Sequence, residues 1–373
     1  MRKLILLLLM ALFMVITAFS AETSQKEFNV SKGQSLDVNL KVGGSLSITG
    51  WEKEKVGVIV HFKKTTPDQW DIRFTEKEGR IEIGADYKGG APHFSNPEFE
   101  IQVPNQFDLK LKTMAGDIDI RHVSGEITGK TMGGNLKLAY LKGIIDLRTM
   151  GGDITLKDSD VDGKLKTMGG RVLFENVIGD IQGSSMGGNV IYNNVKPREG
   201  RTPNNKDKLD KVSTMGGDIN LSDAPYGADV DTMGGNIHIK SAGNYVKAKT
   251  MGGNITVDAI DGGIKATTKG GNITVIMTGD PQKGDREVNL DSMGGNITLS
   301  VPGELSMDID IELGYTNDGK YNIVSDFQLK LEKVDSGNNT GKKYIYGKAQ
   351  IGGGKHKIKI KTINGDIYLK KSK

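Results

Sequence analysis

The chain has 373 residues, of which 51 are glycine and only 6% are aromatic. It has no cysteine, which excludes disulfides and thiol chemistry, and its glycines show no Gly-X-Y period, which excludes collagen. The formal net charge of +4 is close to balance, so composition gives no reason to expect nucleic acid or a strongly anionic membrane as a partner.

Residues 1–20 have the pattern of a signal peptide. Arg2 and Lys3 precede an apolar stretch over residues 4–16, and the small residues Ala18 and Ser20 suit cleavage before Ala21. The apolar stretch is short for a membrane anchor, and no later segment is apolar enough to span a bilayer. We therefore expect an exported chain that is periplasmic, bound to the cell surface or secreted.

Residues 21–112 read as an irregular N-terminal β region that caps a longer array. The segment 42–48, Val-Gly-Gly-Ser-Leu-Ser-Ile, is a degenerate copy of a corner and strand that recur later in the chain. Residues 56–62 and 99–103 are rich in β-branched and aromatic residues and predict two further strands. A cap is expected here because an open sheet edge invites pairing with another chain.

Residues 113–300 contain ten copies of an 18-residue repeat built on Thr-Met-Gly-Gly. An internal period of this kind is the strongest fold signal in a single sequence. An 11-residue insertion follows the fifth copy, a 6-residue insertion precedes the last, and Lys269 replaces one methionine. The methionines, called position 0 below, are Met114, Met132, Met150, Met168, Met186, Met215, Met233, Met251 and Met293.

The repeat predicts two short strands joined by a glycine corner. Positions +4 and +6 are apolar in every copy and flank a +5 residue that is mostly polar, which is typical of a strand with one buried face. Gly-Gly suits a sharp bend with positive φ, and the Asn or Asp at +3 can form a ladder of hydrogen bonds. One repeat is therefore one rung of a parallel β-solenoid, with rungs about 4.8 Å apart.

The direction of the methionines stays open at this point. Positions −3 and −1 face the same way, and position +4 faces inward too, although it lies five residues after −1. The alternation of inward and outward residues must therefore reverse once in the corner. If the reversal follows the Thr or Ser at −1, the methionines form a ladder inside the core, which is the simpler interpretation. If it falls at Gly-Gly, they form an exposed stripe suited to a partner, and Lys269 favours this alternative.

The insertion at 196–211 is the best candidate for a functional loop on this scaffold, although a tolerated surface excursion is the simpler interpretation. Its candidate contact residues are Lys196, Arg198 and Arg201. Residues 301–373 form a C-terminal β region in which 307–311 alternates as a strand. Residues 362–369 repeat the corner motif with Ile363 in place of methionine, so this region is expected to complete the solenoid.

The sequence contains no convincing catalytic, cofactor or metal site. Calcium-binding repeats have a period of nine residues and contain a further glycine and aspartate after Gly-Gly. These corners recur every 18 residues and lack that further pair, and Arg171 would repel a cation. Residues 125–131 resemble a phosphate loop, but the leading glycine is replaced by Ser124 and the surrounding pattern is strand. The five histidines have no metal-ligand spacing, and the acidic residues share no single register.

The chain resembles a bacterial β-strand-repeat family known as putative adhesins, a domain of unknown function. The resemblance covers nearly all of the mature chain. It rests on residues 44–51 (Gly-Ser-Leu-Ser-Ile-Thr-Gly-Trp), on the Met-Gly-Gly-Asn/Asp-Ile array, and on residues 351–354 and 361–367. It implies an all-β, single-stranded right-handed parallel β-helix and an exported, non-enzymatic role, and it supplies no catalytic residues.

These observations lead to a non-catalytic adhesin or binding scaffold of the cell envelope as the main hypothesis. Its partner would be a protein or polysaccharide of the cell surface or matrix, met through the methionines or the insertion. Stackable rungs suggest a structural, self-assembling envelope protein as an alternative. A polysaccharide-active β-helix enzyme is the third hypothesis, because a solenoid can bring distant acidic residues together.

Overall fold

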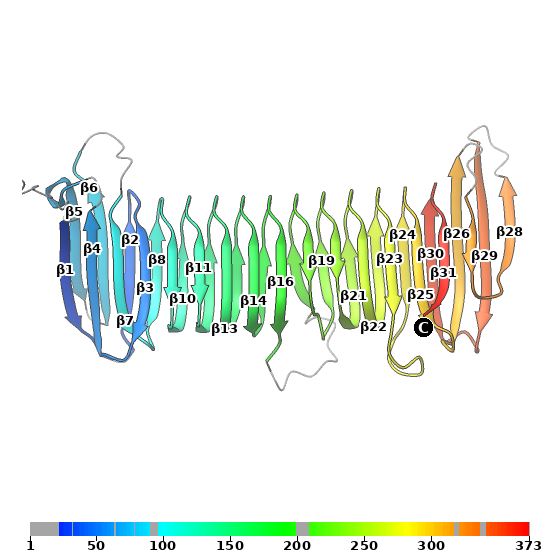
Figure 1. The fold of residues 1–373 in the computed structure, drawn as a ribbon, viewed down its shortest axis with the longest axis horizontal. Helices are drawn as coiled ribbons and strands as arrows, with labels where there is room; N and C mark the ends of the chain where they lie inside the picture. Colours follow the sequence, from blue (N-terminus) through cyan, green and yellow to red (C-terminus); the bar gives the residue numbers. More distant parts are fainter. Residues whose placement is uncertain are drawn as a thin grey trace, which may run out of the picture.

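The computed structural model describes residues 22–31, 33–62, 65–77, 79–89, 96–198, 209–316, 321–335 and 341–372. The predicted signal peptide lies outside these ranges. Within them the only helix is a 3₁₀ turn, η1 (Pro67–Gln69), and 31 strands join one continuous hydrogen-bonded sheet. The expected all-β class is confirmed. The strands stack along the long axis of the molecule like the steps of a ladder (Figure 1).

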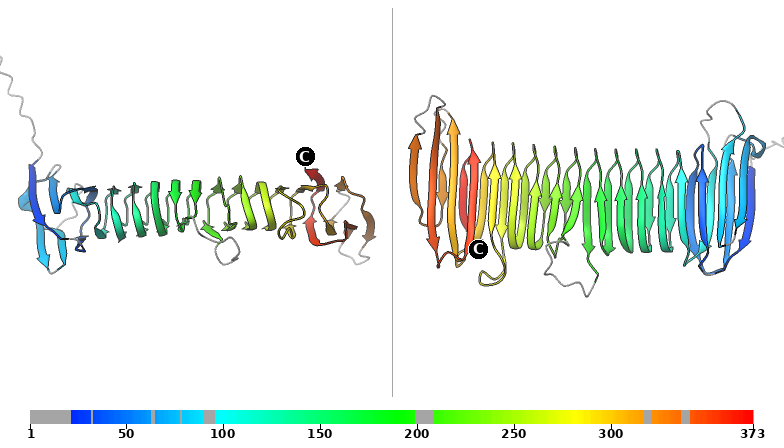
Figure 2. Two further views of the ribbon diagram at one scale, coloured as in Figure 1. Left: turned by 90° about the horizontal axis from the view of Figure 1, so that it is seen from below. Right: turned by 180° about the vertical axis from the view of Figure 1, so that it is seen from behind.

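Each repeat contributes one strand before its Gly-Gly corner and one after it, and the two sets form two layers (Figure 2). The pre-corner strands are β8 (Asp108–Thr113), β10 (Ser124–Lys130), β12 (Lys142–Arg148), β15 (Ile181–Ser184), β17 (Asp210–Ser213), β19 (Ala228–Asp231), β21 (Ala242–Lys249) and β24 (Val288–Ser292). The post-corner strands are β9 (Ile118–Arg121), β11 (Leu136–Ala139), β14 (Val172–Ile178), β16 (Val190–Lys196), β18 (Ile219–Leu221), β20 (Ile237–Ile239), β23 (Ile273–Met277) and β25 (Ile297–Pro302). Two longer strands, β13 (Ile154–Lys166) and β22 (Ile255–Thr268), run through both layers.

Pairing within each layer is parallel and follows the sequence period. Ser124 in β10 lies opposite Lys142 in β12, and Ile118 in β9 lies opposite Leu136 in β11, 18 residues further on in each case. Across the insertion, Ser184 lies opposite Ser213, so the extra residues leave the register of the array unchanged.

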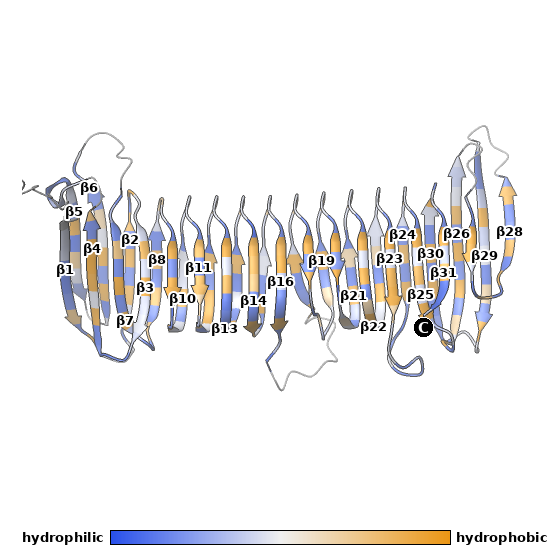
Figure 3. Ribbon diagram, viewed as in Figure 1, coloured by the Kyte–Doolittle hydropathy of each residue, from blue (hydrophilic) through white to orange (hydrophobic). Residues whose placement is uncertain are grey.

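The core is a thin, mainly aliphatic region between the two layers of strands. The side chains at −3, +4 and +6 are almost entirely buried, and polar residues alternate with them along the strands (Figure 3). Ring packing adds to this core where Phe174 and Tyr192 lie with their centroids 4.8 Å apart. Gly183 at position −3 makes room for these rings, because a Cβ there would lie 3.0 Å from the Phe174 ring. The Tyr192 hydroxyl accepts a 2.6 Å hydrogen bond from the Gly183 N–H.

The edge opposite the Gly-Gly corners carries a second stack of bends. In five successive repeats the residue at +8 has a left-handed φ between 46° and 58°; these residues are His122, Tyr140, Asp158, Asn176 and Asn194. Their side chains continue the stack, since the His122 and Tyr140 rings are parallel at 4.7 Å and Asn176 donates to Asp158. Asn and Asp tolerate this conformation better than most residues, which explains their choice here.

At the N-terminal end β1 (Glu22–Asn29) is the outermost strand of its layer, but the strands that follow it do not stack in chain order (Figure 1). Strands β2 (Ser35–Leu40) and β3 (Ser45–Trp51) lie between β6 (Arg80–Tyr87) and β8 and between β7 (Glu98–Pro104) and β9, respectively. Leu46 pairs with Ile118, which confirms the predicted degenerate corner at 42–48. The predicted strands at 56–62 and 99–103 are also confirmed, as β4 (Lys55–Phe62) and β7. Antiparallel pairing of β4 with β1 and of β6 with β5 (Trp70–Lys77) completes this end.

The C-terminal end is built in a similar way. Strands β30 (His356–Ile363) and β31 (Ile367–Ser372) pair with β24 and β25 through residues 70 positions earlier in the chain, which confirms the corner at Ile363. Beyond them lie β26 (Met307–Thr316) and β27 (Ile323–Ser325), which precede them in sequence. An antiparallel hairpin of β29 (Lys342–Ile351) and β28 (Lys330–Asp335) extends this end past β26 (Figure 1).

Candidate functional site

A buried hydroxyl fixes each Gly-Gly corner. The Oγ at position −1 donates to the second glycine's carbonyl in the preceding repeat, over 2.6–3.1 Å, and accepts the second glycine's N–H in its own repeat, over 2.9–3.3 Å. Two buried backbone groups are thereby satisfied by one side chain. The buried hydroxyl residues are Thr113, Thr131, Thr149, Thr167, Ser185, Thr214, Thr232, Thr250, Thr268, Ser292 and Thr362.

Because the hydroxyls point inward, the methionines that follow them point outward. The interpretation of the methionines as a core ladder is wrong, and the alternative of an exposed stripe is correct. All nine side chains at position 0 are between 39% and 54% exposed, and Lys269 is exposed among them. We call this row, from Met114 to Met293, the methionine stripe. Met277 and Met307 are fully buried and belong to the core instead.

The corner backbone stacks tightly from repeat to repeat. The N–H of Gly151 donates to the carbonyl of Met132 over 3.1 Å, and the same contact recurs along the array. A Cβ at the second glycine would collide with the preceding repeat, at 2.1 Å from the Gly134 oxygen in the case of Gly152. Neither Gly151 nor Gly152 has the left-handed φ that the sequence suggested. The second glycine is required by the close approach of stacked backbones.

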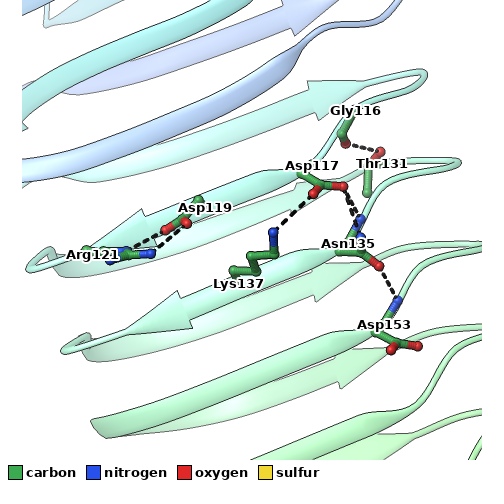
Figure 4. A network of polar contacts seen from close by, with 8 residues as sticks. All are labelled: Gly116, Asp117, Asp119, Arg121, Thr131, Asn135, Lys137 and Asp153. Atoms are coloured by element: carbon green, nitrogen blue, oxygen red, sulfur yellow. Dashed lines mark hydrogen bonds and ion pairs between the residues drawn. The ribbon is translucent and has the colours of Figure 1, made fainter.

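The residues at +3 form the ladder that their position predicted. Asp117 accepts the backbone N–H of Asn135 over 2.8 Å, and Asn135 in turn accepts that of Asp153 (Figure 4). Burial disfavours the charged form of Asp117, but the hydrogen bonds from Asn135 and Lys137 lower its pKa overall. Arg171 carries no acceptor and ends the first half of the ladder. A second half continues from Asn189 to Asp366 and the Asn322 N–H.

A basic row runs beside the N-terminal half of the methionine stripe. It consists of Lys112, Lys130, Arg148 and Lys166, which occupy position −2 on four neighbouring strands and are exposed. The row and the stripe together line a surface groove of 980 Å³ that reaches from Lys112 to Met233. Reasoning from the sequence missed this row, although its signal was available as four basic residues spaced 18 apart.

The candidate residues of the insertion lie away from the methionine stripe. Lys196 is the last residue of β16, a strand that begins just after a Gly-Gly corner and ends at the opposite edge, and Arg198 follows it closely. Arg198 forms ion pairs with Asp160 at 2.7 Å and with Asp162 at 2.8 Å, and the hydrogen bond that its guanidinium donates to Asp160 is the main cause of its raised pKa. Arg201 lies outside the described residues. The structure therefore brings the nine methionines together and leaves Lys196 and Arg198 elsewhere.

The described ranges hold no group of three or more His, Asp or Glu side chains arranged to bind a metal ion. His61 and His238 each contact a single carboxylate instead, at 3.3 Å from Glu100 and at 2.7 Å from Asp258, respectively. In the same part of the chain, no helix combines the length and apolarity needed to cross a membrane.

Of the known proteins compared with this chain, only solved structures are similar to it. No family model matches the chain, and no curated protein matches it. A putative cell adhesion protein from Clostridium sporogenes covers 94% of this chain and 100% of its own, with 12% identity and a TM-score of 0.20. A putative adhesin from Parabacteroides distasonis covers 75% and 97%, with 12% identity and a TM-score of 0.35.

A putative lipid binding protein from Parabacteroides distasonis is also similar, with 14% identity, a TM-score of 0.28 and coverage of 75% and 97%. These identities and TM-scores are too low to carry function or detailed geometry from those proteins to this one. The solved structures similar to this chain thus include bacterial proteins named as putative adhesins, the family that the sequence resembles.

Proposed function

We propose that the protein is an exported, non-catalytic right-handed parallel β-solenoid that serves as an adhesin or binding scaffold of the cell envelope. The methionine stripe is its contact surface. The observation that carries this proposal is the exposure of nine methionines in one register, on corners whose buried hydroxyls prevent them from turning inward. Residues 113–300 form the binding array, and residues 21–112 and 301–373 close its two ends.

The stripe has the properties of a docking surface. Methionine is flexible and polarizable, so a row of methionines can adapt to an uneven apolar partner. The stacked corners hold the backbone beneath the row through repeated hydrogen bonds, which keeps the stripe straight over a distance of roughly 43 Å at the usual strand spacing. A contiguous apolar patch of this kind is uncommon on a monomer and marks an interaction site.

The alternative of end-to-end self-assembly receives less support. The terminal strand β28 pairs with β29 on one side only, and its outward residues include Lys330, Glu332, Lys333 and Asp335. At the other end β5 carries Asp71, Arg73, Glu76 and Lys77. Charged side chains on an edge strand oppose pairing with a second copy, so both ends have the character of caps.

A pair of matched triple variants tests the proposed function. In the first, Met186, Met215 and Met233 become Gln; in the second, Ile144, Ile178 and Ile276, which are 38–58% exposed elsewhere, become Gln. Binding of the labelled mature chain to intact bacterial cells, matrix proteins and polysaccharides is then measured. We expect the stripe variant to lose affinity by about tenfold or more and the control to keep it, because anchor residues dominate an interface. Equal binding by both variants would contradict the role of the stripe.

The cellular location is tested separately. Cells that express the full chain are fractionated and treated with a protease that cannot enter them. Loss of residues 1–20 and recovery of the chain from the periplasm, the surface or the medium are the expected results. Retention of an uncleaved chain in the cytoplasm would contradict export.

A further inference from the structure

The basic row is a run of like charges that extends over four neighbouring strands. Other like-charged neighbours in the sheet, such as Lys247 opposite Lys265, are single pairs. Lys112 lies directly opposite Lys130, Lys130 opposite Arg148, and Arg148 opposite Lys166, all on one face. Like charges directly opposite each other on neighbouring strands are destabilising. The row therefore reduces the stability of the sheet that carries it.

The neighbouring row at position −4 shows how the same sheet avoids this cost. There Lys110 pairs with Asp37 at 3.2 Å, Lys164 with Asp146 at 3.0 Å, and Lys247 with Asp229 at 3.1 Å. Within the described residues, none of the four side chains of the basic row forms an ion pair with a carboxylate. A local violation without compensation in the free protein points to a site that is completed by a ligand.

The basic row separates two hollows of different character. On one side lies the 980 Å³ groove that it shares with Met114, Met132, Met150 and Met168. On the other lies a hollow of 590 Å³, lined by the row together with Lys110, Lys164 and the carboxylates Asp37 and Asp146, both of which are already paired with lysines. Unpaired positive charge and exposed apolar surface therefore meet along a single line.

The charge beside the groove changes from one end of the groove to the other. Position −2 is basic beside the first four methionines, but it is Ser184, Ser213 and Asp231 beside Met186, Met215 and Met233. The groove is thus cationic at its N-terminal end, and it becomes neutral and then acidic at its C-terminal end while remaining apolar along its whole length. A ligand that carries its negative charge at one end matches this gradient better than a uniformly charged polymer does.

We infer that this groove binds a single anionic amphiphile, that is, a molecule with a phosphate or carboxylate head and an alkyl or acyl tail. The head lies at the basic row, and the tail lies along the methionines toward Met233. This inference rests on the proposed function in that it names the ligand class for the N-terminal half of the same stripe. The volume of 980 Å³ is at the upper end of the range for sites that hold small molecules.

The test uses dodecyl phosphate below the concentration at which it forms micelles. Binding to the full mature chain is measured by calorimetry and by NMR of methionines labelled with ¹³C in their methyl groups. We expect saturable binding with shifts at Met114 to Met233 and none at Met293, which lies beyond the groove. Dodecyl maltoside, which has the tail without the charge, and inorganic polyphosphate, which has charge without a tail, should each bind at least about tenfold more weakly.

Two variants with the same change of net charge locate the head. Changing Lys112, Lys130, Arg148 and Lys166 to Gln should weaken dodecyl phosphate binding about tenfold or more, since four favourable charge contacts are removed. Changing the exposed Lys265, Lys348, Lys357 and Lys359 to Gln should leave binding unchanged. All eight side chains are on outer faces, and circular dichroism with thermal unfolding verifies that both variants fold.

Several results would overturn the inference. Equal loss in both charge variants, or equal affinity for dodecyl maltoside or for polyphosphate, would show that the basic row does not select an anionic amphiphile. Binding only to vesicles of phosphatidylglycerol and phosphatidylcholine, with none to monomers, would show that the edge docks on a membrane instead. If dodecyl phosphate fails to bind while the Met186, Met215 and Met233 variant still loses cell-surface binding, the ligand class is wrong and the proposed function stands.

Discussion

At the scale of single residues, the hydroxyl at position −1 determines the direction of everything around it. It donates to a carbonyl of the preceding repeat and accepts an N–H of its own repeat, and it must point inward to do both. The methionine next to it is then forced outward. Ser185 and Ser292 make the same two contacts as threonine, so the hydroxyl matters and the methyl group does not.

The two corner glycines should respond differently to the same substitution. In Gly152→Ala the new Cβ would lie 2.1 Å from the Gly134 oxygen, whereas in Gly151→Ala the nearest atom is 3.7 Å away. We expect Gly152→Ala to lower the free energy of unfolding by about 1–3 kcal/mol through overpacking and Gly151→Ala to change it by less than about 0.5 kcal/mol. Urea unfolding measures both. The first repeat already has Ala115 at the tolerant position, and equal effects would contradict this account.

Asp117 should make the stability depend on pH in the acid range. Its pKa in the folded chain lies below the ordinary value of 3.8, so its ionised form contributes stability above that value. The contribution is lost as the pH falls through the folded-state pKa. Because the carboxylate is 40% exposed, we expect the loss to be no more than about 1 kcal/mol.

The variant Asp117→Asn keeps an acceptor for the Asn135 N–H but cannot titrate in this range. Its unfolding midpoint should therefore fall less steeply than that of the natural chain between about pH 5 and pH 2. Thermal unfolding across this range is the measurement. An unchanged acid slope would show that Asp117 does not contribute.

At the scale of strands, the like-charged basic row is the clearest source of instability in the array. In Lys130→Glu the new carboxylate would lie between Lys112 and Arg148 and would replace two repulsions with two attractions. We expect the free energy of unfolding to rise by about 0.2–1 kcal/mol for each new pair. The control Lys164→Glu should lower it, because Lys164 pairs with Asp146 at 3.0 Å. Chemical denaturation at low ionic strength distinguishes these signs.

The repeating strands were predictable because their information is local. The alternation at +4 and +6 and the glycine at +2 are visible in any one copy, and the period then gives the pairing partner 18 residues away. The direction of the methionines was not predictable by the same means. Position +4 lies five residues after position −1, so one reversal is required between them. Its place depends on a hydrogen bond between neighbouring repeats that no single copy contains.

The candidate site was predicted in part for a related reason. The nine methionines form one surface because they share one position in the repeat, which the sequence shows directly. The basic row shares position −2 in only four copies, so a search for residues common to all copies passes over it. Lys196 and Arg198 were chosen because they lie in an insertion, and composition alone could not show that Arg198 is paired with Asp160 and Asp162.

At the scale of the whole molecule, the array should tolerate a change in its length. Deletion of residues 150–167 removes one 18-residue period and joins Thr149 to Met168 in an equivalent position. We expect the shortened chain to fold with a similar content of β-structure, because each repeat contacts mainly its neighbours. Deletion of residues 150–158, half a period, should prevent folding, since it joins a pre-corner strand to the opposite edge. Circular dichroism and protease resistance test both, and folding of the half-period deletion would contradict the register.

The position of β30 and β31 also affects the order in which the strands can pair during folding. These last two strands lie between β24 and β26 and between β25 and β27, so their partners on both sides are made before them. During synthesis the earlier repeats can pair in order, each on the one before, but near-identical copies also permit pairing that is displaced by a whole repeat. Residues 356–372 pair on one side with β24 and β25 of the last repeat and on the other side with β26 and β27, which lie outside the repeats. Their arrival completes the end of the molecule and favours the state in which every earlier repeat has taken its own place.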